Sequence, residues 1–168
     1  MKRLLLYVHF NKYDHISRHV FYQLEHMRPL FDKLVFISNS RLSESAAQKL
    51  RDTHLIDDFI QRENKGYDFA AWHDGMEFVG FENLKQYDSV TVMNDTCFGP
   101  LWDMAPIYDN YESNPNVDFW GMTNHQGIKA GDIYIHEHLQ SYFISFKKRL
   151  VESSVFQNFW KSVESFED

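Results

Sequence analysis

The fold-deciding part of the chain reads Arg62-Glu63-Asn64-Lys65-Gly66-Tyr67-Asp68-Phe69-Ala70-Ala71-Trp72, followed about thirty residues later by Val92-Met93-Asn94-Asp95-Thr96-Cys97-Phe98-Gly99-Pro100. Each stretch places small, polar and acidic residues where an apolar, strand-like run ends. In an open α/β sheet, ligands bind at the carboxyl ends of the strands. A flexible Gly66 at one edge and a lone carboxylate, Asp95, at the other favour a site for a nucleotide or a nucleotide sugar over a packing feature.

The composition indicates one globular, acidic domain. The 168 residues match the size of a single domain, and hydrophobic residues make up 43% of them, enough for a sizeable core. The formal net charge of −7 argues against a general nucleic-acid binder, because such proteins carry a basic field. An acidic protein that binds an anionic ligand therefore needs a metal ion, a helix N-terminus or a few well-placed cations.

The cysteine content and the first residues bear on the compartment. Cys97 is the single cysteine, so no intrachain disulfide can form, and a reducing, cytoplasmic compartment is expected. The apolar run at the N-terminus is too short for a signal peptide and lacks a small-residue cleavage site, so it is predicted to be a first strand. No run approaches the roughly 20 apolar residues of a membrane span, so any membrane contact is expected to be peripheral.

Apolar, strand-like runs alternate with helical patterns along the chain. Strands are predicted at 4–10, 33–38, 56–61, 89–93, 117–122 and 133–135, and helices at 17–31, 44–53, within 64–87, at 104–112 and over 139–163. This alternation predicts a three-layer α/β/α domain over residues 1–168, with a mostly parallel sheet. The last residues, 164–168, supply neither a cap nor a closing strand, which indicates a truncated or minimal version of a larger domain.

Four motifs occur in an order that resembles a known family. They are Glu63-Asn64-Lys65-Gly66-Tyr67-Asp68-Phe69, Asn94-Asp95-Thr96 with Gly99-Pro100, Val117-Asp118-Phe119-Trp120-Gly121-Met122-Thr123, and His138-Leu139-Gln140-Ser141-Tyr142-Phe143. Together they closely resemble the rhamnan synthesis protein F family of glycosyltransferases, which build rhamnose-containing bacterial cell-surface polysaccharides. The resemblance runs from Leu4 to about Trp160, which is nearly the whole chain.

A broader resemblance to GT-A-type glycosyltransferases lies beneath it. The ends of the first four predicted strands carry Phe10-Asn11, Asn39-Ser40, Asn64-Lys65-Gly66 and Asn94-Asp95-Thr96. The last of these is similar to the Asp-x-Asp metal motif but departs from it, because only one carboxylate is present. The resemblance implies a GT-A-like, nucleotide-diphospho-sugar transferase core.

The resemblance implies that two of the motifs bind the nucleoside-diphosphate part of the sugar donor. Asp95 is expected to bind Mg²⁺ or Mn²⁺ bridging the diphosphate, since hard cations prefer oxygen ligands; the alternative is that Asp95 caps the turn before Pro100. Gly66 lets the backbone approach the ligand closely, and Lys65 can meet a phosphate. Asn64 and Asp68 can bond base or ribose, with Asp68 as a helix N-cap the alternative, and both roles can hold at once.

Further residues complete the expected nucleotide-sugar site. Phe10, Asn11, Asn39 and Ser40 are expected to line the base pocket, with ordinary strand termination as the alternative. Asn94 belongs to the same set, and so does Gln140, which is expected to open the C-terminal helix and present its amides to an anion.

The sequence offers three candidates for the catalytic base, His125, Glu137 and His138, which follow the predicted fifth strand; His125 and Glu137 are preferred. Asp118 is expected to be solvated and Phe119 to face the core. The helix that carries His19 is expected to keep this histidine on the surface, which argues against a zinc site. No nucleophile-elbow sequence occurs, so a hydrolase is not expected.

The sequence thus predicts transfer of rhamnose, or a related sugar, from a nucleoside-diphosphate sugar to a cell-surface polysaccharide. By resemblance, the donor is deoxythymidine-diphosphate (dTDP) rhamnose and the acceptor a growing, lipid-linked glycan at the inner face of the membrane. One alternative is a non-catalytic nucleotide-sugar-binding module. The other is an unrelated, flavodoxin-like domain, against which the lack of an early Gly-rich loop after Phe10 argues.

Overall fold

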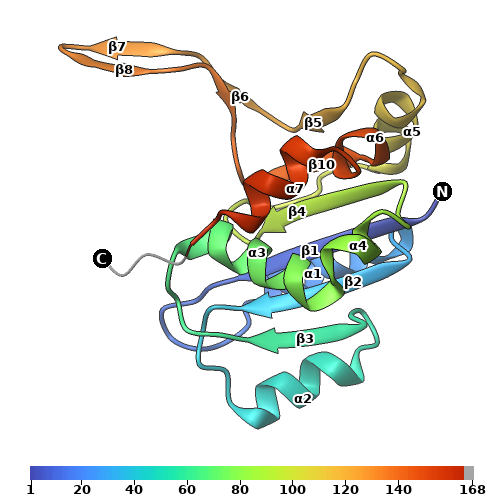
Figure 1. Cartoon of the computed structure of the whole chain (residues 1–168). Coiled ribbons are helices and arrows are strands. Elements are labelled where there is room, and N and C mark those ends of the chain that lie inside the picture. Colours follow the sequence, from blue (N-terminus) through green and yellow to red (C-terminus); the bar gives the residue numbers. More distant parts are fainter. Residues whose placement is uncertain (165–168) are drawn as a thin grey trace.

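The computed structural model describes residues 1–164, which form a six-stranded sheet between two layers of helices (Figure 1). The order of the strands is β3-β2-β1-β4-β10-β5. Their bounds are β1 Arg3–His9, β2 Lys33–Ser38, β3 Asp58–Gln61, β4 Ser89–Asn94, β5 Phe119–Gly121 and β10 Phe143–Lys147. The first four strands run parallel, whereas β10 is antiparallel to both β4 and β5. The prediction of a mostly parallel, three-layer α/β/α sheet is confirmed.

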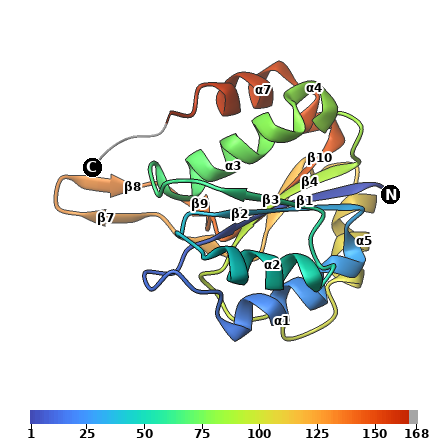
Figure 2. The ribbon, with the colours of Figure 1, turned by 90° about the horizontal axis from the view of Figure 1, so that it is seen from below.

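The helices divide between the two faces of the sheet, as Figure 2 shows. Their bounds are α1 Arg18–Met27, α2 Glu44–Asp52, α3 Tyr67–Val79, α4 Phe81–Leu84, α5 Ala105–Ser113, α6 Lys148–Val151 and α7 Ser154–Lys161, with a 3₁₀ turn at Arg28–Leu30. One core contains Leu4, Leu6 and Val8 of β1 and packs against α3, α4, α6 and α7. The other contains Leu5 and Tyr7 and packs against α1, α2 and α5. Alternate residues of a strand point to opposite faces, so residues 4–8 of β1, which face both cores, are all apolar.

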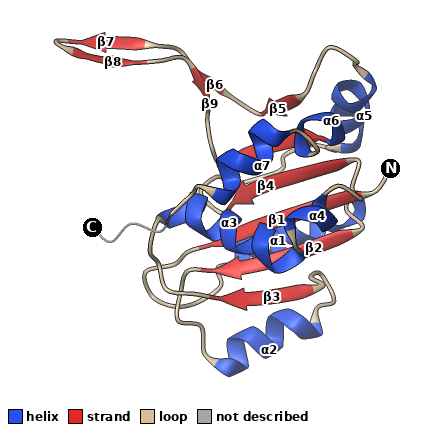
Figure 3. Ribbon diagram, in the orientation of Figure 1, coloured by secondary structure: helices blue, strands red, loops and turns tan. Residues whose placement is uncertain are grey.

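The predicted C-terminal helix over 139–163 is wrong in its first part, because residues 143–147 form β10 (Figure 2), and the helices of this region are the later α6 and α7 (Figure 3). Phe143 packs into the core that contains Tyr7, while Ile144 and Phe146 pack into the opposite core. Apolar side chains at 143, 146 and 150 also fit a helical period, so the pattern alone could not separate the two structures. The strand is selected by its backbone pairing with β4 and β5. Gln140 therefore precedes a strand and opens no helix.

The segment between β5 and β10 forms an arm that leaves the sheet. Two short ladders build it: β6 Asn124–His125 with β9 His138–Leu139, and β7 Ile128–Ala130 with β8 Ile133–Ile135. The hairpin β7–β8 projects beyond the body of the molecule (Figure 1). The short strand predicted at 133–135 is confirmed as β8.

The orientation of β5 differs from the prediction. Phe119 is 51% exposed, and Trp120 is the residue that enters the core, where its ring stacks on Tyr111 at 4.8 Å between centroids. The exposed Asp118 carboxylate accepts a hydrogen bond from Arg149 Nε at 2.6 Å. The prediction that Phe119 faces the core was therefore wrong by one residue, which in a strand inverts both faces.

The structure also bears on the expectations for the membrane and for the end of the chain. Within residues 1–164, no helix combines the length and the apolar character needed to cross a bilayer. The expectation that the chain ends without a closing element concerns 164–168, and residues 165–168 lie outside the described part of the chain.

Candidate nucleotide-sugar site

The carboxyl ends of β1, β2 and β4 meet the start of α3 around a pocket of about 350 Å³, which we call the Asp95 pocket. It is lined by Phe10, Asn11, His19, Asn39, Asn64, Tyr67, Asp68, Asp95 and Thr96. Six of these, Phe10, Asn11, Asn39, Asn64, Asp68 and Asp95, are residues that the sequence predicted for a nucleotide-sugar site. The pocket lies where ligands bind in open α/β sheets.

A wider pocket adjoins it and carries the cations of the region. This Arg62 pocket, of about 680 Å³, is lined by Asp14, Asn39, Arg41, Gln61, Arg62, Glu63, Asn64 and Lys65. Asn39 and Asn64 line both pockets, which makes the two continuous. Lys65, predicted to meet a phosphate, lies in the Arg62 pocket and forms an ion pair with Glu63 at 3.1 Å. The site thus has a basic and an acidic compartment.

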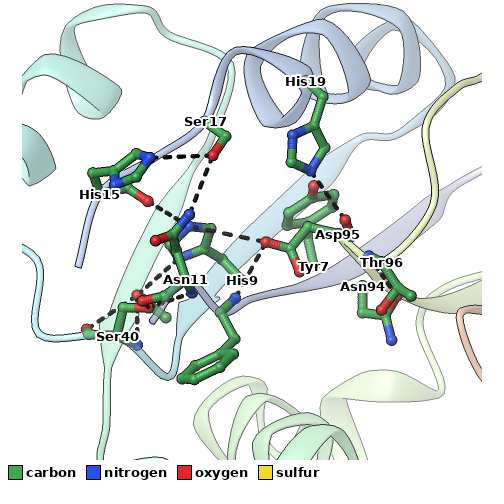
Figure 4. A network of polar contacts seen from close by, with 12 residues as sticks. Tyr7, His9, Asn11, His15, Ser17, His19, Ser40, Asn94, Asp95 and Thr96 are labelled. Atoms are coloured by element: carbon green, nitrogen blue, oxygen red, sulfur yellow. Dashed lines mark hydrogen bonds and ion pairs between the residues drawn. The ribbon is translucent and has the colours of Figure 1, made fainter. Parts of the chain in front are cut away.

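Asp95 follows β4 and is held from β1 and α1 (Figure 4). One carboxylate oxygen, Oδ2, accepts the Phe10 N–H at 3.2 Å and lies 3.9 Å from His9 Nε2. His19 Nε2 lies 3.0 Å from the Asp95 carbonyl oxygen. The Asp95 side chain is only 13% exposed, and this burial raises its pKa from 3.8 to about 6, against the opposing effect of the Phe10 hydrogen bond. The turn before Pro100 is instead capped by Asn94, whose Oδ1 accepts the Thr96 N–H.

His9 supports the site from beneath. Its side chain is fully buried between Ser38 Oγ and the His15 carbonyl oxygen, each 3.2 Å from a ring nitrogen. Burial lowers the pKa of His9 to about 4, so the ring is neutral at neutral pH. His9 therefore packs beside the Asp95 carboxylate without forming a charged pair with it.

The loop after β3 turns sharply into α3 at Gly66. Gly66 is the N-cap residue with φ +69°, and Tyr67 follows with φ +50°. Asp68 is consequently not the N-cap, as one alternative held, but lies in the first turn of the helix. Its Oδ2 accepts a hydrogen bond from Asn94 Nδ2 at 2.6 Å, which couples the start of α3 to the end of β4. Burial raises the pKa of the Asp68 carboxyl, and the Asn94 bond partly offsets that rise.

Arg62 organises the loop that contains Asn64. Its side chain is 11% exposed and donates three hydrogen bonds: to Asp74 Oδ2 at 2.6 Å, to Asn39 Oδ1 at 2.8 Å and to the Lys65 carbonyl oxygen at 2.8 Å. These partners belong to α3, to the end of β2 and to the loop itself. The guanidinium therefore fixes three segments of the site at once.

Asn11 and Ser40 tie the ends of β1 and β2 together. Ser40 Oγ accepts the Asn11 N–H at 2.7 Å and donates to the Asn11 carbonyl oxygen at 3.0 Å (Figure 4). Asn11 lines the Asp95 pocket, whereas Ser40 is buried behind it. Ser40 thus shapes the base of the site through its neighbour.

The remaining predicted residues lie on the arm, outside both pockets. Asn124 Nδ2 donates to Glu137 Oε1, and the His125 ring stacks on His138 at 5.0 Å between centroids. His125 Nδ1 is buried without a hydrogen-bond partner among the described residues. Gln140 accepts a hydrogen bond from the Thr123 hydroxyl. Neither His125 nor Glu137 is brought next to Asp95 in the lining of its pocket.

Sequence reasoning missed two residues of the site. His19 was expected on the outer surface, yet it lines the Asp95 pocket; its place in the first turn of the helix after β1 was the available signal, because that turn faces the ligand edge of the sheet. Arg62 was read only as part of the opening motif. Nothing in the sequence marks it as the donor to three separate segments.

The oxygen donors of the Asp95 pocket fit a hard divalent cation. Asp95 and Asp68 supply two carboxylates, and Mg²⁺ is often held by one or two carboxylates together with substrate phosphates. Within residues 1–164, no group of three or more His, Cys, Asp or Glu side chains could hold a metal by itself. The donor set therefore suits a cation that binds together with a phosphate ligand.

Solved structures define the class of this fold. A mannosyltransferase from Pyrobaculum calidifontis, in complex with GDP-mannose and Mn²⁺, aligns with a TM-score of 0.57 over 89% of this chain and 45% of its own, at 12% identity. A 4-diphosphocytidyl-2C-methyl-D-erythritol synthase aligns with the same TM-score over 98% of this chain and 82% of its own, also at 12% identity. The chain therefore has the GT-A-like fold of nucleotidyl- and glycosyltransferases.

The chain belongs to the rhamnan synthesis protein F family, which it matches over residues 34–168. An uncharacterized protein of Sinorhizobium fredii is 29% identical over 150 residues, which are 89% of this chain and 37% of that protein. The virulence protein VirA of Vibrio anguillarum is 33% identical over 107 residues, which are 63% of this chain and 31% of that protein. The chain spans about a third of the length of these curated relatives. The family and the structural neighbours support a nucleotide-sugar transferase, so the unrelated, flavodoxin-like alternative is wrong.

Proposed function

We propose that residues 1–168 form one GT-A-like glycosyltransferase domain that transfers rhamnose from dTDP-rhamnose to a cell-surface polysaccharide acceptor. The observation that carries this proposal is the Asp95 pocket. Six predicted residues, from four separate segments of the chain, meet there at the ligand edge of the sheet. Membership of the rhamnan synthesis protein F family supports the choice of sugar.

The two compartments suit the two parts of such a donor. The base and ribose occupy the Arg62 pocket up to Asn39 and Asn64, which line both pockets, and Phe10 and Asn11 border them from the Asp95 pocket. Lys65 is proposed to reach from the Arg62 pocket to a phosphate. The diphosphate lies towards the Asp95 pocket, where Asp95 and Asp68 hold Mg²⁺ or Mn²⁺. The cation, when bound, offsets the charge that develops on the departing diphosphate. His19 lines the same pocket and donates its Nε2–H to the Asp95 carbonyl oxygen, which holds the turn after β4 beside the diphosphate.

The acceptor is proposed to approach from the arm. His125 and Glu137 are the candidates for the base that removes the proton of the acceptor hydroxyl. They lie outside the Asp95 pocket, so the acceptor must bridge the distance to the donor, or the arm must move. A lipid-linked acceptor places the domain in the cytoplasm, in peripheral contact with the inner face of the membrane. No nucleic-acid partner is proposed, given the net charge of −7.

The alternative proposal is a non-catalytic module that binds the nucleotide sugar. It is favoured by the single carboxylate of the Asn94-Asp95-Thr96 motif and by the separation of the base candidates from the pocket. Release of dTDP from dTDP-rhamnose, measured with Mn²⁺ and a rhamnose-containing glycolipid, separates the two. An enzyme releases dTDP at a rate that Asp95→Asn lowers at least a hundredfold. Donor binding without any release above background contradicts the enzyme and supports the module.

A further inference from the structure

The turn at residues 94–97 borders a second, smaller pocket. Asp95 and Thr96 line the Asp95 pocket, whereas Asn94 and Cys97 line a pocket of about 170 Å³ between α1, β4 and β10. Four methionines contribute to it, Met27, Met93, Met104 and Met122, and we call it the methionine pocket. It therefore adjoins the proposed donor site through one tight turn.

The lining of the methionine pocket is uncharged, and its amide groups are already bonded. None of the described residues around it is Asp, Glu, Lys, Arg or His. Gln23 Nε2 donates to the Cys97 carbonyl oxygen at 2.6 Å, and Gln23 Oε1 accepts from the Tyr7 hydroxyl. Asn94 uses both ends of its amide on Asp68 and Thr96. The other side chains of the lining that can form hydrogen bonds are Cys97, Trp102 and Tyr142. A hydroxyl group that entered would therefore exchange its water partners for few replacements, which is unfavourable.

The pocket is deep and apolar at its floor and open at its rim. Met27, Met93 and Met104 are at most 7% exposed, whereas Leu101 and Trp102 at the rim are 77% and 60% exposed. A volume of about 170 Å³ is a fraction of the Arg62 pocket and suits a small group on a sugar ring. Methionine side chains adapt their shape to such a group.

We propose that the methionine pocket binds the methyl group of a 6-deoxysugar whose diphosphate lies in the Asp95 pocket. This inference rests on the proposed function, since it needs a nucleotide sugar in the neighbouring site. Its position next to that site, on the other side of the turn at residues 94–97, and its uncharged lining favour this occupant. The pocket would then select a methyl over a hydroxymethyl group at C6, because only the methyl leaves no hydroxyl without a partner.

The test compares two donors that differ at one group. Calorimetric titration of the full chain with Mn²⁺ uses dTDP-rhamnose, which is dTDP-6-deoxy-L-mannose, and dTDP-L-mannose, with dTDP alone as the reference. The expected result is about tenfold to hundredfold tighter binding of the deoxysugar, the discrimination that one small group in an apolar pocket supplies. Met122→Gln places an amide at the partly exposed edge of the pocket and should reduce that ratio towards one, without changing the affinity for dTDP.

The control variant is Ile128→Gln, a similar change on the half-exposed hairpin β7–β8, which should keep the wild-type ratio. If the wild type binds both sugars with equal affinity and still binds dTDP, the proposed methyl pocket is overturned, but the proposed donor site is retained. A third outcome is that both sugars bind equally, while farnesyl phosphate binds to the wild type and not to Met122→Gln. This result would overturn the proposed methyl pocket and indicate that the pocket binds an acceptor lipid. Failure to bind dTDP and both sugars would overturn the proposed function, and this inference with it.

Discussion

At the scale of single residues, burial of the Asp95 carboxyl in the candidate site lowers the stability of the fold at neutral pH. Its pKa is raised to about 6 by burial, so the folded protein holds the proton more tightly than the unfolded chain, where the value is near 3.8. The carboxyl therefore contributes stability that is fully present below about pH 4 and is lost as the pH rises through about 6. At neutral pH the charge is retained in a pocket that disfavours it, which is typical of functional sites.

The first prediction is that Asp95→Asn stabilises the protein at pH 8. Removing the ionised carboxylate should raise the free energy of unfolding by about 1–3 kcal/mol there, since one pKa unit corresponds to about 1.4 kcal/mol, and the gain should vanish at pH 4. Urea denaturation at both pH values measures it. Asp118→Asn is the control, because Arg149 lowers the pKa of that exposed carboxyl, so no gain is expected. An Asp95→Asn protein less stable than the wild type at pH 8 would refute this account.

The second prediction concerns Arg62 as a positioning residue. Arg62→Ala releases Asn39, Asp74 and the loop at Lys65 together, so the affinity for dTDP should fall about tenfold or more. Arg62→Lys should recover part of this affinity, because a lysine ammonium can stay beside Asp74 but cannot make all three hydrogen bonds of the guanidinium. Titration of dTDP measures the affinities, and thermal unfolding reports stability separately.

The matched control is Arg51→Ala, which removes an exposed ion pair with Glu44. Such pairs contribute little, so neither dTDP binding nor stability should change appreciably. The positioning role of Arg62 would be disproved by Arg62→Ala binding dTDP as tightly as Arg51→Ala.

At the scale of elements, the entry into α3 depends on a backbone conformation that side chains rarely adopt. Gly66 has φ +69°, and Gly131 at the tip of the hairpin β7–β8 has φ +62°, with nothing within 4 Å of an added Cβ. The third prediction is that Gly66→Ala and Gly131→Ala each lower the free energy of unfolding by about 1–2 kcal/mol. Only Gly66→Ala should weaken dTDP binding, since it shifts the loop that carries Asn64. Similar dTDP affinities for both variants would contradict the role given to this turn.

The sequence predicted best those elements whose own residues favour the structure that they adopt in the folded protein. Strands β1, β2 and β4 are short and mainly apolar, and Ser43 caps α2 by accepting the Ala46 N–H. By contrast, β10 follows from its pairing with β4 and β5, which no local pattern reveals. Its apolar residues fit a helix equally well, so the error arose where long-range hydrogen bonds decide the structure.

In the site, too, the sequence could place some residues, whereas others depend on contacts between distant segments. Residues directly after strands, such as Phe10, Asn39 and Asp95, could be placed because parallel strands end at one edge of a sheet. The hydrogen bonds from Asn94 to Asp68 and from Arg62 to Asp74 join segments that are distant in sequence. His19 reaches the pocket only through the packing of α1 beside β4, which its helical spacing does not disclose.

At the scale of the whole molecule, two cores hold the sheet rigid while the site lies at its edge. Among residues 1–164, fifteen buried residues form the core on one face and fifteen the core on the other, so the strand ends are fixed from both sides. The loops that follow these ends are therefore free to carry polar, strained and buried charged residues. The candidate site lies at this edge, and none of the residues that line the Asp95 pocket belongs to either described core.

The fourth prediction is that dTDP-rhamnose binds to this protein together with a divalent cation held by Asp95. Calorimetric titration with dTDP-rhamnose should give binding in the presence of Mn²⁺ that weakens at least tenfold when EDTA removes the metal. Asp95→Asn should bind weakly and equally with or without Mn²⁺, while it remains folded by circular dichroism. Binding that is the same in wild type and variant would contradict the placement of the cation at Asp95, and the absence of heat under every condition would contradict the donor site itself.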